Sequence, residues 1–227
     1  MDTTFWGPSG HSLFHLLTYR FDQNDLPGGR KDLRSLFRSV GHVLPCIYCR
    51  RSFQQYARQF PLRRFLRHPH PHSFLWYYHI HNLINAKLRG QGYPMRKDPS
   101  LQTVTRTYQR LSSAKNKGPT CLVGRDFLYA VTYQFSTSLS ERRQRAYRTF
   151  FRQLAVLYPI DSIREEYVRY LADHPVEDAM KGPLPLTRWF HRFDRRVNAK
   201  VCSFQRRCNI LERFHVKTCA NRTCRRK

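Results

Sequence analysis

The stretch Pro45-Cys46-Ile47-Tyr48-Cys49 carries two cysteines separated by two residues, and His81-Asn82-Leu83-Ile84-Asn85 begins 32 residues beyond Cys49. A C-x-x-C pair can close a small disulfide. If Cys46 lies at the first turn of a helix, the backbone N–H groups and the helix dipole favour its thiolate, which could then exchange disulfides. The same spacing supplies half of many zinc sites, so the pair alone leaves both interpretations open. The segment from His81 to Asn85 decides between the redox and the zinc interpretation.

Composition indicates a globular and strongly basic protein. The chain has 227 residues, 41% of them hydrophobic and 14% aromatic, which is enough for one core of normal size or two small ones. Its 41 Lys and Arg against 15 Asp and Glu give a formal net charge of +26, spread along the whole chain. A field of this strength attracts polyanions. Because charge alone carries no sequence readout, a nonspecific basic surface and binding of nucleic acid or an acidic partner both stay open.

The sequence carries no signal for a membrane or for export. No window approaches the roughly 18 apolar residues of a membrane span, and residues 1–10 lack the basic region and apolar core of a signal peptide. We therefore expect no membrane partner and no secretion through a signal peptide. Seven cysteines in such a chain argue against a secreted disulfide framework and favour catalytic or metal-binding roles for some of them.

Apolar residues recur at helical spacing along most of the chain. Leu33, Leu36, Phe37 and Val40 follow the i, i+3, i+4, i+7 pattern of a helix with one buried face. Further helices are expected around residues 12–17, after the cysteine pair, at 73–89 and at 99–111. Residues 112–119 have the composition of a linker, and no segment alternates as a strand does. The pattern predicts an all-α fold with four helices by residue 90.

The second half of the chain repeats the first. Three pairs of segments align at an offset of 113 or 114, namely residues 76–88 with 189–201, 17–21 with 131–135, and 44–49 with 158–163. The first pair shares a tryptophan and the sequence Asn-Ala-Lys, whereas in the last pair both cysteines are replaced, by Ile160 and Ile163. We therefore predict a duplicated helical domain that has lost its redox centre.

His81 and Asn85 are four residues apart, so they share one face of the predicted helix, with Asn82 beside them. An imidazole can stack on an adenine or isoalloxazine ring, and asparagine amides can both donate to and accept from the edge of a flavin. A histidine on a helix is by itself more often an ordinary structural residue. The prediction therefore depends on His81, Asn82 and Asn85 occurring together with the C-x-x-C pair.

In order and spacing, these elements resemble the Erv/ALR family of FAD-dependent sulfhydryl oxidases over about residues 5 to 110. The resemblance is carried by Trp6-Gly7-Pro8, His15, Pro45-Cys46-Ile47-Tyr48-Cys49, Phe53, Trp76 and His81-Asn82-x-x-Asn85-x-x-Leu88. It implies a bundle of four helices and a short fifth that holds FAD noncovalently, with the C-x-x-C disulfide beside the flavin.

The resemblance also implies the catalytic roles of the two cysteines. Cys46 would be the interchange thiol that incoming substrate attacks, and Cys49 would face the flavin. Cys49 as a thiolate would then donate to the flavin ring through a charge-transfer complex, and the disulfide would form again. Reduced FAD would pass its electrons to dioxygen, with release of hydrogen peroxide. Two thiols of a protein substrate would become one disulfide.

The cofactor-binding positions implied by the resemblance come from two segments. They are Trp6, Gly7, His11, His15, Tyr19, His81, Asn82, Asn85, Lys87, Leu88 and Arg89. Lys87 and Arg89 suit the flavin phosphates because of their charge. His11 stands where the family usually has an aromatic residue, and Arg89-Gly90 where it has Gly-Lys, so which cation reaches the pyrophosphate stays open.

Four of the remaining cysteines lie in the basic C-terminal segment: Cys202, Cys208, Cys219 and Cys224. Cys219 and Cys224 could be a shuttle pair, of the kind that relays electrons to the flavin-proximal disulfide in many oxidases of this type. A structural disulfide, such as Cys202 with Cys208, and a zinc site are the alternatives, although the spacings are unlike the usual zinc pairs. Our prediction includes no metal, and the role of Cys121 stays open.

We predict three parts: an Erv/ALR-like domain at residues 1–113, a degenerate pseudo-Erv helical domain at 114–201 and a basic cysteine-containing tail at 202–227. The second domain would pack on the first as an internal pseudo-dimer and bind no flavin. In it Cys46, Cys49, His15, His81 and Asn82 correspond to Ile160, Ile163, Tyr129, Asp194 and Arg195, and only Asn198 survives.

The predicted function is that of a thiol oxidase acting on thiol-bearing protein substrates and dioxygen. The alternative is a basic nucleic-acid-binding or virion structural protein on the same helical scaffold. Duplicated, stand-alone forms resemble oxidases encoded by large DNA viruses of animals, which leads us to expect the host cytoplasm or nucleus, or the virion. Whether the protein also forms a homodimer stays open.

Overall fold

The computed structural model describes residues 3–67, 69–94, 97–113 and 122–198 of the chain. Within these ranges all regular structure is helical, which confirms the predicted all-α fold. The helices are α1 (Thr3–Asp22), α2 (Arg30–Val43), α3 (Ile47–Gln59), α4 (Leu62–Phe65), α5 (Ser73–Gly90), α6 (Leu101–Ser113), α7 (Arg125–Tyr133), α8 (Glu141–Leu157), α9 (Asp161–Asp173), α10 (Val176–Ala179) and α11 (Pro183–Asn198). None of the helices in the described ranges is long and apolar enough to cross a membrane.

The helices agree with the sequence pattern except at two places. Helix α1 begins at Thr3, well before the apolar stripe at residues 12–17. The one-turn helix α4 makes five helical segments before residue 91, where four were expected. A helix of four residues is shorter than one period of any apolar pattern, so periodicity could not indicate it. Cys121 and the four tail cysteines lie outside the described residues.

Local capping by Asp32 and Asp22 fixes where α2 and α5 begin. Helix α2 begins after Gly29, whose backbone N–H donates to the Asp32 carboxylate at 2.8 Å. Asp22, the last residue of α1, caps α5, because its carboxylate accepts from the backbone N–H groups of Ser73 and Phe74 at 2.9 and 2.8 Å. The start of α5 is therefore tied to the end of α1.

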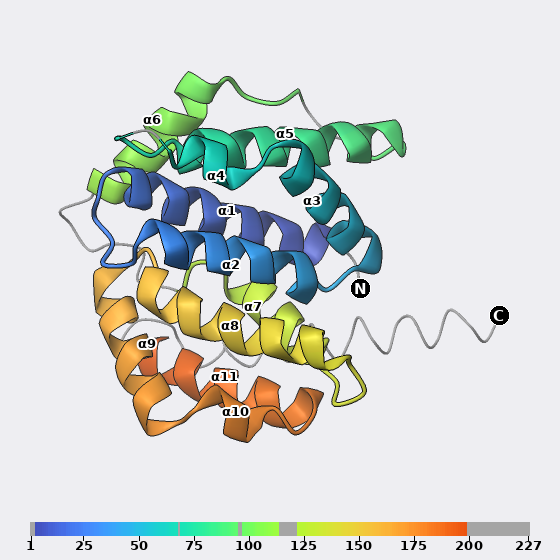
Figure 1. The fold of residues 1–227 in the computed structure, drawn as a ribbon, viewed down its shortest axis with the longest axis vertical. Helices are drawn as coiled ribbons and strands as arrows, with labels where there is room; N and C mark the ends of the chain where they lie inside the picture. Colours follow the sequence, from blue (N-terminus) through green and yellow to red (C-terminus); the bar gives the residue numbers. More distant parts are fainter. Residues whose placement is uncertain (1–2, 68, 95–96, 114–121, 199–227) are drawn as a thin grey trace.

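The two halves of the chain share one core. Helices α1, α2, α7 and α8 lie in the middle of the molecule, with α3 to α6 on one side and α9 to α11 on the other (Figure 1). Helix α2 packs along α8, and α1 packs against both α5 and α7. Buried apolar residues from both halves form a single cluster, in which Trp76 and Trp189 are each 1% exposed. Each half thus covers apolar surface that the other would expose.

Helix bounds repeat along the chain at the offset found in the sequence. Helices α9 and α10 begin and end 114 residues after α3 and α4, and α8 ends 114 residues after α2. The tryptophan contacts repeat too. Trp76 Nε1 donates to the carbonyl of Phe60 at 2.7 Å, and Trp189 Nε1 donates to that of His174 at 2.9 Å. These bounds and contacts support the predicted duplication.

Candidate active site

Cys46 and Cys49 lie on the first turn of α3. Cys46 is the N-cap residue, and its sulfur accepts a hydrogen bond from the backbone N–H of Cys49 at 3.3 Å. Both residues are half-buried free thiols. The first N–H groups of a helix lack partners within the helix, and its dipole is positive at this end, so a negative charge on the cap is stabilised.

The surroundings of the two thiols give them opposite pKa shifts. Burial raises the pKa of Cys46, but hydrogen bonds from the Cys49 thiol and from the backbone N–H groups of Cys49 and Tyr48, with the Lys87 charge, outweigh it and lower the pKa overall. Burial raises the pKa of Cys49 to about 12, together with its bond to Cys46 and the Cys46 charge. Cys46 is therefore the thiol that ionises first in the reduced pair.

A cavity of about 530 Å³ lies beside this pair, and Cys49 rather than Cys46 is on its wall. Its lining comes from α1, the C-terminal end of α2, the first half of α3, α5 and the segment that follows it, α6 and α7. Of the residues predicted to bind the cofactor, the wall includes Trp6, Gly7, His11, His15, His81, Asn85, Lys87 and Leu88. Two segments that are far apart in sequence thus meet around one space.

Three predicted cofactor residues do not line this cavity: Tyr19, Asn82 and Arg89. Asn82 and Arg89 are seven residues apart on α5 and lie just outside the part of its surface that lines the cavity, where Arg89 pairs with the same Asp98 carboxylate as Asn85. Tyr19 lies one turn beyond His15 on α1, where its ring meets Phe74 edge to face at 5.5 Å. The cavity ends before it reaches that ring.

Three histidines form a cluster on the cavity wall. The ring of His11 stacks on that of His81 with centroids 3.6 Å apart and planes 9° apart. His15 Nε2 lies 2.9 Å from His81 Nδ1, so one of these nitrogens donates and the other accepts. Burial lowers the pKa of His15 to about 3 and that of His81 to about 4, and it lowers the pKa of His11 as well. All three rings are neutral at neutral pH.

Two buried polar atoms on the same wall have no hydrogen-bond partner. They are Nε1 of Trp6 and Nδ1 of His15. A buried polar group without a partner costs about 1–3 kcal/mol, and a ligand that pairs with it removes this cost. An apolar cavity with a few convergent polar atoms is typical of a cofactor site.

Asp98 organises the end of α5 and was missed by the sequence analysis. Its carboxylate accepts from Asn85 Nδ2 at 2.7 Å and pairs with Arg89 at 2.6 Å. The hydrogen bond from Arg89, followed by that from Asn85, lowers the pKa of Asp98. One signal was available, because Asp98 is the single acidic residue between residues 33 and 113 of this basic chain.

Two further aromatic residues on the wall were also missed. The ring of Tyr108 from α6 stacks on that of His15 with centroids 5.2 Å apart and planes 24° apart. Phe127 from α7 contacts the rings of Trp6 and Phe14 at 5.9 and 5.3 Å. A Cβ added at Gly10 would lie 3.1 Å from Phe127, so glycine permits this close approach. The second half of the chain thus contributes to the wall.

The corresponding place in the second half is filled by polar side chains. Arg125, Tyr129 and Asp194 stand where the first half has His11, His15 and His81. Arg125 Nη2 and the Tyr129 hydroxyl donate to Asp194 Oδ2 at 2.6 and 2.8 Å, and the Asp194 side chain is fully buried. A paired carboxylate here takes the position of a histidine that lines the cavity in the first half.

Comparison with known families places residues 9–106 of this chain in the Erv1 / Alr family. The matched range includes both cysteines of α3 and the histidines of α1 and α5. The match supports the resemblance of this part of the chain to that family, which generally comprises FAD-linked sulfhydryl oxidases. Comparisons with curated proteins and with solved structures gave no match.

Proposed function

We propose that this protein is an FAD-dependent sulfhydryl oxidase that forms disulfides in protein substrates and reduces dioxygen. The observation that carries the proposal is that only one of the two cysteines lines the cavity. Cys49 lines a cavity that also holds His81 and Lys87, whereas Cys46 caps α3 off the cavity wall. One thiol is therefore available to a protein partner and the other to a cofactor.

The cavity has the size of a ligand site, and its lining suits the chemistry of FAD. Its 530 Å³ falls within the usual range of ligand sites, about 300–1,000 Å³. The unpaired nitrogens of Trp6 and His15 offer hydrogen bonds to a polar ligand, the stacked His11 and His81 offer ring faces, and Lys87 offers a positive charge. FAD, when bound, supplies the two-electron acceptor that links thiol oxidation to formation of hydrogen peroxide.

The cysteines perform the thiol exchange in two steps. A substrate thiolate attacks Cys46 of the disulfide form, the bond between Cys46 and Cys49 breaks, and Cys49 leaves as a thiolate. The positive charges of Lys87 and Arg50 lower the pKa of Cys49 and so stabilise this leaving group. A second substrate thiolate then attacks the mixed disulfide, releasing Cys46 as a thiolate and the substrate as a disulfide.

The mixed disulfide removes two of the three causes that raise the pKa of Cys49, and only burial is left. In the reduced pair, the Cys46 charge and its hydrogen bond both raise the pKa of Cys49. Once Cys46 is bonded to substrate, it carries no charge, and only burial opposes the attraction of Lys87 and Arg50. The order of events thus favours a thiolate at Cys49, on the cavity wall, when substrate is attached.

Flavin content and oxygen consumption test the proposal directly. The purified protein is expected to show flavin absorbance and to consume oxygen with dithiothreitol, with one hydrogen peroxide formed per dithiol oxidised. Cys46→Ala and Cys49→Ala should each abolish turnover while leaving the helical circular dichroism unchanged. A protein that binds no flavin, or binds it and consumes no oxygen, would contradict the proposal.

We also propose that residues 114–201 are a degenerate copy of the oxidase domain that packs as an internal pseudo-dimer. The repeated helix bounds, the repeated tryptophan contacts and the packing of α1 and α2 on α7 and α8 support this. The Arg125 and Asp194 pair supports the further proposal that this copy binds no flavin. One flavin per chain is the expected stoichiometry, and two would contradict it.

The alternative function, nucleic-acid binding without turnover, has its support in the charge of +26. It predicts salt-sensitive binding to DNA by a protein that carries no flavin. Because a family that generally comprises oxidases matches residues 9–106, we keep the oxidase as the main proposal.

A further inference from the structure

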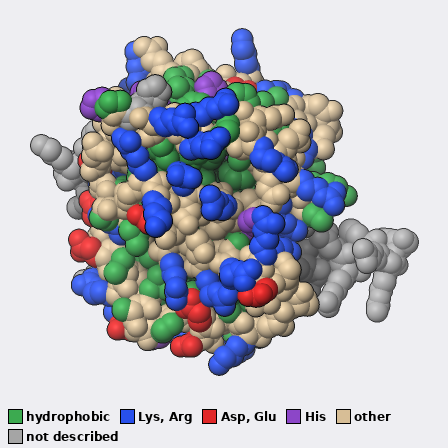
Figure 2. Space-filling model, in the orientation of Figure 1, with side chains coloured by type: hydrophobic (Ala, Val, Ile, Leu, Met, Phe, Trp, Pro, Cys, Tyr) green, Lys and Arg blue, Asp and Glu red, His purple; other side chains and the backbone are tan. Residues whose placement is uncertain are grey.

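A second groove, of about 350 Å³, lies between α2, α3, α4 and the start of α8. Its floor is apolar and includes Phe53 and Trp76. Its rim carries five arginines and a histidine, which are Arg34, Arg38, Arg58, Arg63, Arg142 and His42. Lys and Arg side chains crowd the face of the molecule on which α2 and α3 lie (Figure 2). The groove therefore offers positive charge around an apolar strip.

The groove leads toward the redox centre. Along α3, Cys46, Arg50, Gln54 and Arg58 follow each other at four-residue spacing, so they share a face of the helix. Gln54 and Arg58 line the groove, and Gln54 lies about 12 Å along the helix axis from Cys46. A polypeptide lying in the groove would therefore have its next residues at Cys46.

The positive charge of the rim is not neutralised by the protein itself. No acidic residue lines the groove, and none of its five arginines makes an ion pair with a residue that the structure describes. At the end near Cys46, burial and the charges of Arg142, Arg143 and Arg50 together lower the pKa of His42. Cations that crowd one another in this way favour an anionic partner.

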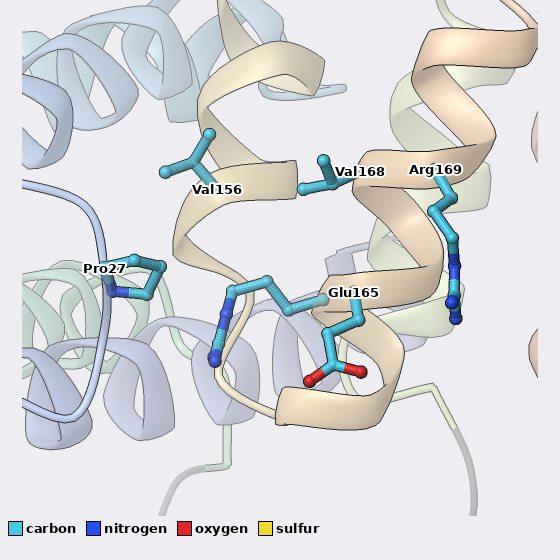
Figure 3. A pocket seen from close by; sticks show the side chains of 6 residues that line it. Pro27, Val156, Glu165, Val168 and Arg169 are labelled. Carbon is cyan, nitrogen blue, oxygen red and sulfur yellow. The ribbon is translucent and has the colours of Figure 1, made fainter.

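The second half of the chain has a groove that shares two equivalent positions with this one and differs from it in character. It lies between α8 and α9, has about 520 Å³, and is lined by Pro27, Val156, Arg164, Glu165, Val168 and Arg169. Val156 and Val168 stand 114 residues after His42 and Gln54, and both line this groove (Figure 3). This groove contains a carboxylate, and Ile160 and Ile163 replace the cysteines beside it. The fully cationic rim thus accompanies the half that has the thiols.

We propose that the cationic groove binds an acidic segment of the thiol-bearing protein substrate and presents the adjoining thiols to Cys46. The inference rests on the proposed oxidase function and adds the chemistry by which substrate is chosen. Carboxylates would pair with the rim arginines, and an apolar side chain would lie on the floor over Phe53 and Trp76. At the cysteine end, Tyr48 is 67% and Ile47 48% exposed, which gives the partner further apolar contact.

A peptide suits these features better than a nucleic acid does. A nucleic acid has no thiol to present to Cys46, so the position of the groove at the end of α3 would have no use. Exposed apolar residues inside the C-x-x-C turn also suit contact with a polypeptide. Binding of DNA in the groove is therefore kept as an outcome that the experiment must detect.

The test compares three thiol substrates on the flavin-loaded full chain. They are dithiothreitol, a synthetic peptide with a Cys-x-x-Cys pair followed by a run of Glu, and the same peptide with Gln in place of Glu. We expect kcat/KM for the Glu peptide to exceed that for the Gln peptide by on the order of tenfold. The preference should largely disappear at about 0.5 M salt, where the Debye length is about 4 Å.

Charge reversal locates the effect on the surface. Arg34→Glu with Arg38→Glu should remove the preference for the Glu peptide, relative to dithiothreitol turnover of the same variant. The matched control is Arg148→Glu with Arg152→Glu, 114 residues further on, which changes net charge by the same amount and should retain the preference. All four arginines lie outside the core, and the one ion pair that is lost, between Arg152 and Glu177, is largely exposed and contributes little, so folding should survive in both variants.

Each outcome has one meaning. Absence of dithiothreitol oxidation in the unmodified protein would refute the oxidase function itself. Oxidation of dithiothreitol with equal rates for the two peptides would overturn the docking proposal alone. Loss of the preference in both charge-reversed variants would overturn it too, because net charge rather than the groove would then be responsible. A groove that binds duplex DNA, but for which the Glu peptide does not compete, would overturn it as well.

Discussion

The backbone N–H of Cys49 donates to the sulfur of Cys46 at 3.3 Å, so the first turn of α3 is capped by one of its two reactive thiols. The arrangement couples the charge of Cys46 to the integrity of the helix. A thiolate accepts this bond more strongly than a thiol, and the helix dipole adds to the preference. The two cysteines are thus distinct chemical groups before any substrate arrives.

We predict that Cys46 is alkylated faster than Cys49 in the reduced protein. Its pKa is lowered, so its thiolate fraction at neutral pH exceeds that of an ordinary cysteine, whereas the pKa of Cys49 is raised to about 12. Iodoacetamide labelling followed by peptide mass spectrometry at several pH values measures both rates. Lys87→Met should slow the labelling of Cys46, because the Lys87 charge lowers its pKa. Faster labelling of Cys49 would contradict this assignment.

Acid should destabilise the flavin-free protein through its histidine cluster. The pKa values of His15 and His81 fall from 6.5 to about 3 and about 4 on folding, so the folded state binds fewer protons than the unfolded state below pH 6.5. Their contribution to stability is complete above pH 6.5 and is lost as the pH falls toward 4, by up to about 1.4 kcal/mol per pH unit for each ring.

Urea unfolding at pH 7.5, 6 and 5 measures this loss. His15→Gln removes one of the titrating rings and should give a shallower dependence on pH than the unmodified protein. An unfolding free energy that stays constant between pH 7.5 and 5 would show that the rings are protonated in the folded state.

The buried ion pair between Arg125 and Asp194 should contribute to folding stability and have no part in catalysis. Asp194→Asn leaves Arg125 without its charge partner, and breaking a buried ion pair in this way costs about 3–5 kcal/mol. Tyr129→Phe removes one hydrogen bond to the same carboxylate and should cost about 1 kcal/mol. Denaturant unfolding gives both values. Turnover per bound flavin should be unchanged in the folded protein, and a loss of it would assign the pair a part in the reaction.

Phe127 should affect flavin retention although it lies outside the residues that match the Erv1 / Alr family. Its ring contacts Trp6 and Phe14 on the cavity wall, so Phe127→Ala would open the wall and destabilise the fold by about 3–5 kcal/mol. The Kd for FAD, measured by fluorescence at a temperature where the variant stays folded, is expected to rise. Phe150→Leu, which changes a neighbouring buried ring that is not on the wall, is the control. Equal Kd values for the Phe127 and Phe150 variants would contradict the prediction.

The sequence was sufficient for those features that depend on local pattern. Leu33 and Leu36 are fully buried on α2, as their spacing predicts, and the residues around His81 and Asn85 form one helix. The segments that resemble the family meet at one cavity because each motif lies on a helix whose turn fixes which residues share a face. The match of residues 9–106 confirms the family.

Features that depend on contacts between distant segments could not be predicted. Asp98 reaches Asn85 from the loop that follows α5, and nothing in the spacing of these residues indicates the bond. Phe127 meets Trp6 only because α7 packs on α1. Alignment of the two halves gave Tyr129 and Asp194 as counterparts of His15 and His81, but it did not reveal that they bond to each other. Cavity residues such as Tyr108 belong to helices that carry no motif.

The contact of Phe127 with the cavity wall has a consequence for the timing of synthesis. All the cysteines and histidines of the site have left the ribosome long before α7 emerges, yet the wall is incomplete until Phe127 docks on Trp6 and Phe14. The nascent chain therefore carries its reactive thiols for a time without a closed cofactor cavity. For the proposed flavoprotein, we therefore expect the cofactor to be captured only after α7 has been synthesised.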